Sequence, residues 1–218
     1  MTEFIKRIKT ALAEYIFTVR CPYCDTVILR NHYVCDECIK KFTYPPLKSY
    51  AIGGYICVSP FRYDGIFKKA IIRFKFHGRA SMAKELSFPL ADVIKDIFPD
   101  KHFDIITCVP AHTSTLKERG YNQAQKLAQE CSKRLDIMYF DTLVKIKKNT
   151  PQHSISASKR GDNVKGVYKI YDKELINDKT ILLIDDIITT GNTLGECAKV
   201  LMKNGCKEVL CATFCSAN

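Results

Sequence analysis

The stretch ILLIDDIITTGNTL, residues 181–194, decides the fold class of this chain. Four apolar residues precede the acid pair Asp185 and Asp186, and two further apolar residues lead to a turn of Thr, Gly and Asn. A continuous apolar run is typical of a strand buried on both faces of a parallel sheet. The turn then opens a helix predicted over 193–205, whose first N–H groups and dipole attract anions. The stretch therefore predicts a phosphate-binding crevice at the end of a strand.

The turn differs from two other phosphate-binding motifs. It lacks the Gly-Lys-Ser/Thr element of a Walker A loop and the G-x-G-x-x-G fingerprint of dinucleotide-binding folds. Neighbouring carboxylates such as Asp185 and Asp186 repel each other unless hydroxyl donors or a cation compensate them. The alternative, a capped strand–turn–helix unit without a ligand, needs no acid pair.

Strands alternate with helices through the rest of the chain. Apolar strands are predicted at YICVSPFRY (55–63), FDIITCV (103–109) and VLCATFC (209–215), and helices at 65–76, 82–98 and 121–135. The segment 139–147 alternates in polarity, and the polar stretch 149–165 is predicted to be a loop. This order indicates an α/β fold with a mostly parallel sheet covered by helices on both faces.

Four of the eleven cysteines form two pairs, Cys21-x2-Cys24 and Cys35-x2-Cys38, separated by ten residues. Two such pairs can complete a tetrahedron of thiolates around Zn²⁺, and four thiolates close the site, which makes it structural. The spacing predicts a zinc ribbon. The remaining cysteines lie in apolar patterns and are predicted to be core residues: Cys57, Cys108, Cys131, Cys197, Cys206, Cys211 and Cys215.

The N-terminal part of the chain differs from the α/β pattern. Apolar residues at helical spacing predict an amphipathic helix over 4–19, and the Pro45-Pro46 and Gly53-Gly54 pairs indicate a boundary near residue 50. We therefore expect a module of helix and zinc ribbon at 1–50 and an α/β domain at 51–218. Neither a membrane span nor a cleavable signal is evident, which favours a cytoplasmic protein.

The net charge of +11 favours an anionic partner such as a phosphate ligand or nucleic acid. Basic and aromatic residues interleave between 61 and 76, a pattern that can combine phosphate contacts with base stacking on single-stranded DNA. An ordinary solvated helix face is the alternative. The candidate nucleic-acid contacts are Lys68, Lys69, Arg73, Lys75 and Arg79.

The run of apolar residues, two acids, two apolar residues and TTGNT is similar to the signature of type I phosphoribosyltransferases. The resemblance implies that Asp185 and Asp186 hold the ribose hydroxyls of 5-phosphoribosyl-1-pyrophosphate (PRPP), which is bound with Mg²⁺. It also implies that the turn holds the 5-phosphate, through Thr189, Thr190, Gly191, Asn192 and Thr193.

Further segments resemble the ComF family of competence proteins: YDG at 63–65, KFHGR at 75–79, VPAH at 109–112, RGYNQ at 119–123, PQ at 151–152 and NVKG at 163–166. By position, the resemblance implies a pyrophosphate turn with Ala111 and His112, near Arg119, although Ala111 stands where the family more often has a larger apolar residue. It implies a mobile active-site loop at 149–163, and a catalytic set of Arg160 with the two acids. The biological role that it implies is natural transformation, in which incoming single-stranded DNA is handled together with other transformation proteins.

Several functions share these residues, because binding and catalysis use the same site. One is phosphoribosyl transfer to a nitrogen nucleophile or water, which depends on positioning and electrostatics and needs no Ser or Cys nucleophile. Another is a DNA-binding or PRPP-sensing protein without transferase activity. A phosphoribosyltransferase of nucleotide metabolism is the further alternative, although no segment identifies a nucleobase pocket.

Overall fold

The computed structural model describes residues 19–29, 32–42, 46–51, 53–76, 78–147 and 166–217. The helix predicted over 4–19 lies outside these residues except for Val19, which belongs to a strand, and the loop predicted at 149–165 lies outside them entirely. In the part of the chain that is described, no helix combines the length and the hydropathy that crossing a bilayer requires.

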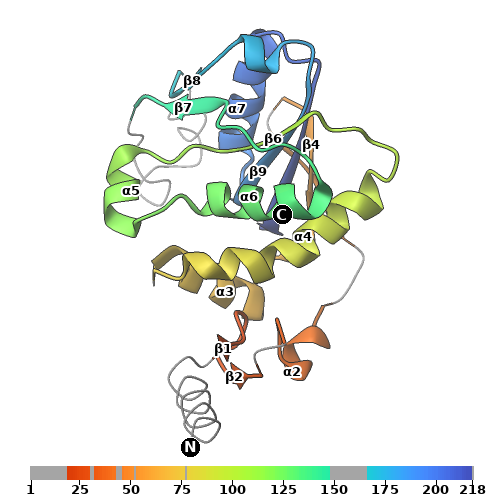
Figure 1. Cartoon of the computed structure of the whole chain (residues 1–218), viewed down its shortest axis with the longest axis vertical. Helices are drawn as coiled ribbons and strands as arrows, with labels where there is room; N and C mark the ends of the chain where they lie inside the picture. The colour runs from red at the N-terminus through yellow and green to blue at the C-terminus, as the bar shows by residue number, and fades with distance from the viewer. Residues whose placement is uncertain are drawn as a thin grey trace, which may run out of the picture.

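A six-stranded sheet forms the centre of the molecule (Figure 1). Its strands are β3 (Leu47–Ala51), β4 (Tyr55–Ser59), β5 (Phe61–Arg62), β6 (Ile105–Cys108), β9 (Thr180–Ile188) and β10 (Glu208–Ser216). They lie in the order β3-β4-β10-β9-β6, and the short strand β5 pairs with β10 beyond the end of β4. Every pair is parallel except β3 with β4. The predicted mostly parallel sheet is therefore confirmed.

Helices cover both faces of this sheet. The helices of the α/β domain are α3 (Gly65–Phe76), α4 (Ala83–Ile97), α5 (Thr113–Arg119), α6 (Gln123–Leu135) and α7 (Asn192–Lys203), with 3-10 turns at Ala80–Met82 and Glu174–Ile176. In Figure 1, α4 and α6 lie in front of the strands and α7 lies behind them. Cover on both sides explains why residues 181–184 of β9 are apolar and fully buried without alternation.

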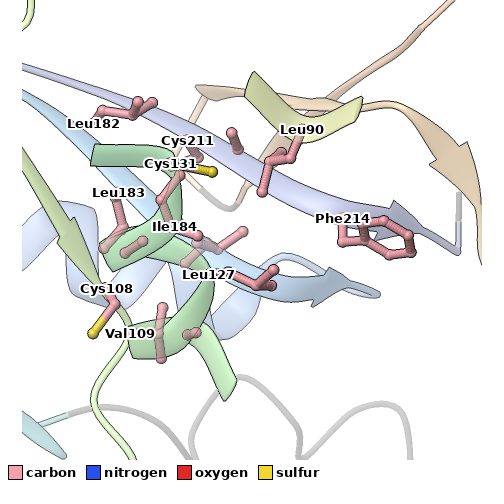
Figure 2. Packing of buried hydrophobic residues seen from close by; sticks show 14 of the residues in the cluster. Leu90, Cys108, Val109, Leu127, Cys131, Leu182, Leu183, Ile184, Cys211 and Phe214 are labelled. Carbon is pink, nitrogen blue, oxygen red and sulfur yellow. The ribbon is translucent and has the colours of Figure 1, made fainter. Parts of the chain in front are cut away.

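The core lies between the sheet and these helices. Figure 2 shows Leu90 of α4 and Leu127 of α6 beside the buried side chains of β9 and β10, including Phe214. The seven cysteines outside the paired motif are all free and buried, as predicted. Burial raises the pKa of the Cys57 thiol to about 12 and that of Cys206 to about 11, so these groups stay protonated core residues.

Two features were not expected from the sequence. Strand β3 crosses the boundary predicted near residue 50, so the central sheet begins a few residues before it, and the division at that point remains a prediction. Strands β7 (Leu143–Lys145) and β8 (Tyr168–Ile170) leave the central sheet and form a separate antiparallel pair.

The cysteine-rich module lies at the opposite end of the molecule from β7 and β8 (Figure 1). It contains the short pair β1 (Val19–Arg20) and β2 (Val27–Ile28) and the helix α2 (Asp36–Ile39). Its Tyr23 is 1% exposed, and the ring packs 5.9 Å from Phe67 of α3 and 6.3 Å from Phe214 of β10, measured between ring centroids. The module is thus anchored in the core of the α/β domain.

Candidate functional site

A cavity of about 320 Å³ lies where β9 meets α7. Its wall consists of Lys75 from α3 and the whole segment 185–194. The carboxyl end of a parallel strand, followed by a helix N-terminus, is the usual place for a ligand in an open α/β sheet. The fold therefore gathers all the residues of the predicted ribose and 5-phosphate site in one cavity.

The two acids of this cavity lie in different surroundings. Asp186 is 7% exposed, and its carboxylate oxygen Oδ2 lies 2.9 Å from Nζ of Lys75. Asp185 is half-buried, and its Oδ1 accepts a hydrogen bond of 2.8 Å from the backbone N–H of Asp186. Within the described part of the chain, the second oxygen of each carboxylate is left as an acceptor for donors that enter the cavity.

The charges in the cavity are coupled. Burial, together with the neighbouring charge of Asp186, raises the pKa of Asp185 from its ordinary value of 3.8 to about 7. Burial alone would lower the pKa of Lys75, but the attraction of Asp186 and Asp185 outweighs it and raises that pKa. Lys75 therefore stays cationic, and Asp185 takes up a proton readily near neutral pH.

The turn between β9 and α7 depends on Gly191. Its φ of 73° lies in the left-handed region, and it is the residue that caps α7 at its N-terminus. Glycine adopts this conformation without the steric cost that a Cβ adds. The turn thereby directs the first N–H groups of the twelve-residue helix α7 at the cavity, where they can donate to a phosphate.

The antiparallel pair β7–β8 is held against the first turns of α7. The N–H of Gly166 donates to Oε1 of Glu196 at 3.0 Å, and Tyr168 of β8 lies beside Thr193. Residue 166 directly follows the polar stretch 149–165 that was predicted to be a loop. Arg160 itself lies outside the described residues.

The three residues predicted for the pyrophosphate turn do not line this cavity. Ala111 lines a separate cavity of about 580 Å³ beside β7. His112 caps α5, where its Nδ1 accepts a hydrogen bond of 3.2 Å from the N–H of Ser114. The guanidinium of Arg119 lies 5.0 Å from the ring centroid of Phe76, the residue after Lys75.

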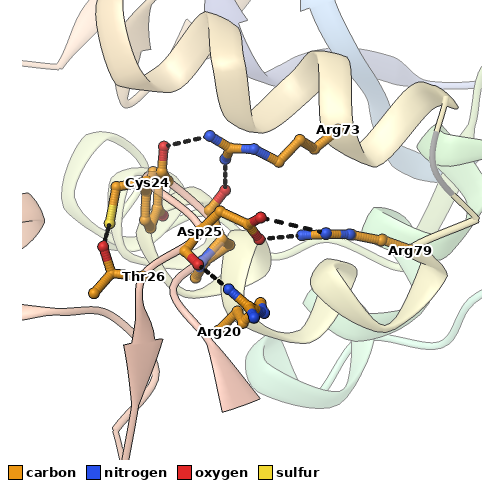
Figure 3. A network of polar contacts seen from close by, with 8 residues as sticks. Arg20, Cys24, Asp25, Thr26, Arg73 and Arg79 are labelled. Atoms are coloured by element: carbon orange, nitrogen blue, oxygen red, sulfur yellow. Dashed lines mark hydrogen bonds and ion pairs between the residues drawn. The ribbon is translucent and has the colours of Figure 1, made fainter. Parts of the chain in front are cut away.

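The structure separates the five basic residues that were predicted to contact nucleic acid. Lys68 and Lys69 are exposed on α3. Arg73 and Arg79 point toward the cysteine-rich module, where Arg79 forms an ion pair with Asp25 (Figure 3). Lys75 lines the cavity described above.

From the sequence alone, Lys75 was predicted to contact nucleic acid, whereas in the structure it lines the cavity. It lies four residues after Ile71 and directly after Phe74, both fully buried, so it borders the apolar face of α3. A basic residue beside the apolar face of an amphipathic helix is the sequence feature that could have indicated a place in the cavity.

The four paired cysteines come together in the N-terminal module. The Sγ atoms of Cys21, Cys24, Cys35 and Cys38 all lie within 4.8 Å of one another, and those of Cys24 and Cys35 are 3.5 Å apart. A tetrahedral zinc ion with Zn–S bonds of about 2.3 Å sets its sulfur atoms about 3.8 Å apart. The cluster therefore has the donor set and the size of a closed zinc site.

Comparisons with known proteins agree with this description. Residues 115–218 match the family described as phosphoribosyl transferase domain. The chain is 31% identical to Competence protein F of Haemophilus influenzae over 194 residues, which cover 87% of this chain and 81% of the relative. It is 28% identical to DNA utilization protein YhgH of Escherichia coli over 207 residues, which cover 89% and 84%.

Among solved structures, an adenine phosphoribosyltransferase aligns with a TM-score of 0.42 and 13% identity, over 79% of this chain and 88% of that chain. The family match over 115–218, together with the order of the parallel strands, confirms the predicted fold class, a type I phosphoribosyltransferase fold. The four-cysteine cluster adds a small N-terminal module to it.

Proposed function

Because this chain belongs to the ComF family of competence proteins, we propose that it binds PRPP with Mg²⁺ in the cavity between β9 and α7 and acts in natural transformation. One observation carries the ligand assignment. A pair of carboxylates, a buried cation and a helix N-terminus converge on one cavity at the end of a parallel strand. This combination matches a ligand that carries both hydroxyl groups and phosphate.

In this proposal each end of the ribose has its own partner. The 2- and 3-hydroxyls donate to the carboxylates of Asp185 and Asp186, which line the cavity. The 5-phosphate accepts hydrogen bonds from the N–H groups of the turn and from the hydroxyls of Thr189, Thr190 and Thr193. Mg²⁺ would accompany the pyrophosphate and offset its negative charge.

The residues proposed to bind the pyrophosphate lie around the cavity and do not form its wall. The charge of Arg119 lies close enough to oppose ionisation of Lys75, which supports a place for Arg119 near the ligand. Arg160 stands six residues before Gly166, which contacts Glu196 of α7, and a role for Arg160 at the pyrophosphate is part of the proposal. Ala111 and His112 are proposed to contact the pyrophosphate in the ligand-bound protein.

Two further parts belong to the proposal. The four cysteines hold a structural zinc ion, supported by the size of the cluster, and the free thiols elsewhere favour a reducing compartment such as the cytoplasm. Single-stranded DNA is proposed to contact the exposed basic side chains of Lys68 and Lys69. The names of the relatives, which refer to competence and to DNA utilization, support this connection.

Titration calorimetry tests the ligand assignment. We expect PRPP with Mg²⁺ to bind with one-site stoichiometry, and ribose 5-phosphate to bind more weakly because it lacks the pyrophosphate. Absence of binding to both ligands would contradict the proposal. An assay of pyrophosphate release, with and without single-stranded DNA or a nitrogen acceptor, then separates a transferase from a protein that only senses the ligand.

A further inference from the structure

The last turn of α3 connects distant parts of the molecule through four consecutive residues. Arg73 contacts the cysteine-rich module, the backbone carbonyl of Phe74 accepts a hydrogen bond from the hydroxyl of Tyr121, Lys75 pairs with Asp186, and Phe76 stacks against Arg119. The cysteine cluster and the acid pair thus both contact the same helical turn.

Arg73 contacts the cysteine-rich module through backbone oxygens of the two residues that separate the first pair of cysteines (Figure 3). The guanidinium of Arg73 donates to the carbonyl oxygen of Pro22 at 2.7 Å and to that of Tyr23 at 3.2 Å. Both residues lie between Cys21 and Cys24. These two carbonyls stay in place for Arg73 only while the chain between the cysteines keeps its turn, and a bound metal fixes that turn.

The contact with the cavity is made two residues later. The side chains of Lys75 and Asp186 are 20% and 10% exposed, so this ion pair is shielded from solvent. Without the ammonium group of Lys75, the adjacent carboxylates of Asp185 and Asp186 would repel each other in the cavity, and no cation in contact with Asp186 would offset their charge. Lys75 therefore offsets the charge of Asp186 and holds one of its carboxylate oxygens in place.

We propose that Lys75 is a positioning residue for Asp186, and that the cysteine module places Lys75 through Arg73, so that metal binding and phosphosugar binding strengthen each other. This inference rests on the proposed function of the cavity and on zinc as the metal. The contacts of Arg73 and Lys75 lie close together along α3, because an α-helix rises about 1.5 Å per residue and the two residues share one turn. Coupling between two binding sites is reciprocal in binding free energy, so the ligand must raise the affinity for the metal if the metal raises the affinity for the ligand. Because changes in affinity appear mainly in the rate of dissociation, we expect this gain as slower metal loss.

The experiment measures both directions of this coupling in the full chain. Zinc transfer from the wild-type protein to a chromophoric chelator is followed with Mg²⁺ alone and with Mg²⁺ and PRPP, and PRPP affinity is measured by calorimetry. We expect PRPP to slow zinc transfer about fivefold or more, which is the usual size of coupling between sites. In Lys75→Met, the affinity for PRPP should fall about tenfold or more, and PRPP should no longer slow zinc transfer.

Conservative and matched variants separate positioning from a general structural effect. Lys75→Arg keeps the cation and should restore most of the affinity and of the protection of zinc. Arg73→Gln leaves the cavity intact but removes the contact with the cysteine module, so it should weaken PRPP binding severalfold and shorten zinc retention. Lys199→Met removes a positive charge from an exposed position of α7 and should change neither measurement.

Failure of this inference can be distinguished from failure of the proposed function. If the wild-type protein does not bind PRPP, both are wrong. If it binds PRPP but Lys75→Met binds equally tightly, or if PRPP leaves wild-type zinc transfer unchanged, only the coupling is wrong. Should Lys75→Met fail to fold by circular dichroism, the wild-type transfer rates and Arg73→Gln still decide the question.

Discussion

The ammonium group of Lys75 lies 2.9 Å from a carboxylate oxygen of Asp186 and thereby brings the end of α3 to the acid pair of β9. Because Lys75 contacts Asp186, Asp185 is the member of the acid pair that has no cation in direct contact among the described residues. Asp185 is consequently the acid whose ionisation is opposed by burial and by its neighbour.

Asp185→Asn should stabilise the ligand-free protein at neutral and alkaline pH. The pKa of Asp185 is raised to about 7 in the folded protein, from an ordinary value of 3.8. Between these two pH values the folded state binds more protons than the unfolded state, so the free energy of unfolding falls as the pH rises. Asparagine has no such titration and can still accept the N–H of Asp186.

Thermal unfolding of both proteins from about pH 4 to about pH 8 provides the measurement. We expect the stability of the variant relative to the wild type to increase across this range, by up to about 4 kcal/mol at the alkaline end, because each pKa unit is worth about 1.4 kcal/mol. A difference in stability that does not change with pH would show that Asp185 titrates normally.

Gly191→Ala should weaken PRPP binding, because φ at this position is 73° and a side chain strains the turn that presents the N–H groups of α7. Gly54→Ala is the matched control. Its φ is 82°, and an added Cβ meets no atom within 4 Å, so it carries similar backbone strain far from the cavity. Calorimetry should show reduced affinity for Gly191→Ala alone, and equal losses in both variants would attribute the effect to general destabilisation.

The purified protein should carry about one zinc ion per chain, measured by elemental analysis. Cys38→Ser removes a ligand and should lower both the zinc content and the solubility. Cys131→Ser changes a buried thiol of α6 outside the cluster and should leave the zinc content unchanged. Full zinc content in Cys38→Ser would place the metal elsewhere.

Single-stranded DNA should bind with an affinity that falls steeply as salt increases, because phosphate contacts release counterions. Replacing Lys68 and Lys69 together by alanine should weaken binding at low salt and reduce the salt slope by about 0.7 for each phosphate that the variant no longer neutralises. Filter binding with an oligonucleotide at several salt concentrations measures both quantities. Binding that does not depend on salt would remove these lysines from the interface.

The sequence was sufficient to predict the parts of the fold that local pattern determines. Residues 181–194 predicted a buried strand, a turn and a helix, and β9, the Gly191 turn and α7 follow that order. The spacing of the paired cysteines predicted a cluster, and the four Sγ atoms lie together. In both cases the interacting residues are close in sequence or follow a strict spacing.

Features that depend on distant contacts could not be predicted in this way. Strand β3 is stabilised by pairing with β4, and its mixed polarity reflects a place at the edge of the sheet. Helix α5 has no buried residue, so its sequence carries no apolar stripe. The role of Lys75 depends on Asp186 in another element, and a basic residue on a basic helix resembles an ordinary surface charge.

The central claim is that Asp185 and Asp186 hold the ribose of PRPP, and calorimetric titration of the double variant Asp185→Ala, Asp186→Ala with PRPP and Mg²⁺ tests it most directly. Removal of both carboxylates takes the acceptors away from the ribose hydroxyls and relieves a repulsion, so binding should suffer while folding does not. We predict no detectable binding at concentrations that saturate the wild type, with zinc content and circular dichroism unchanged. Binding of the folded variant at wild-type affinity would contradict the account.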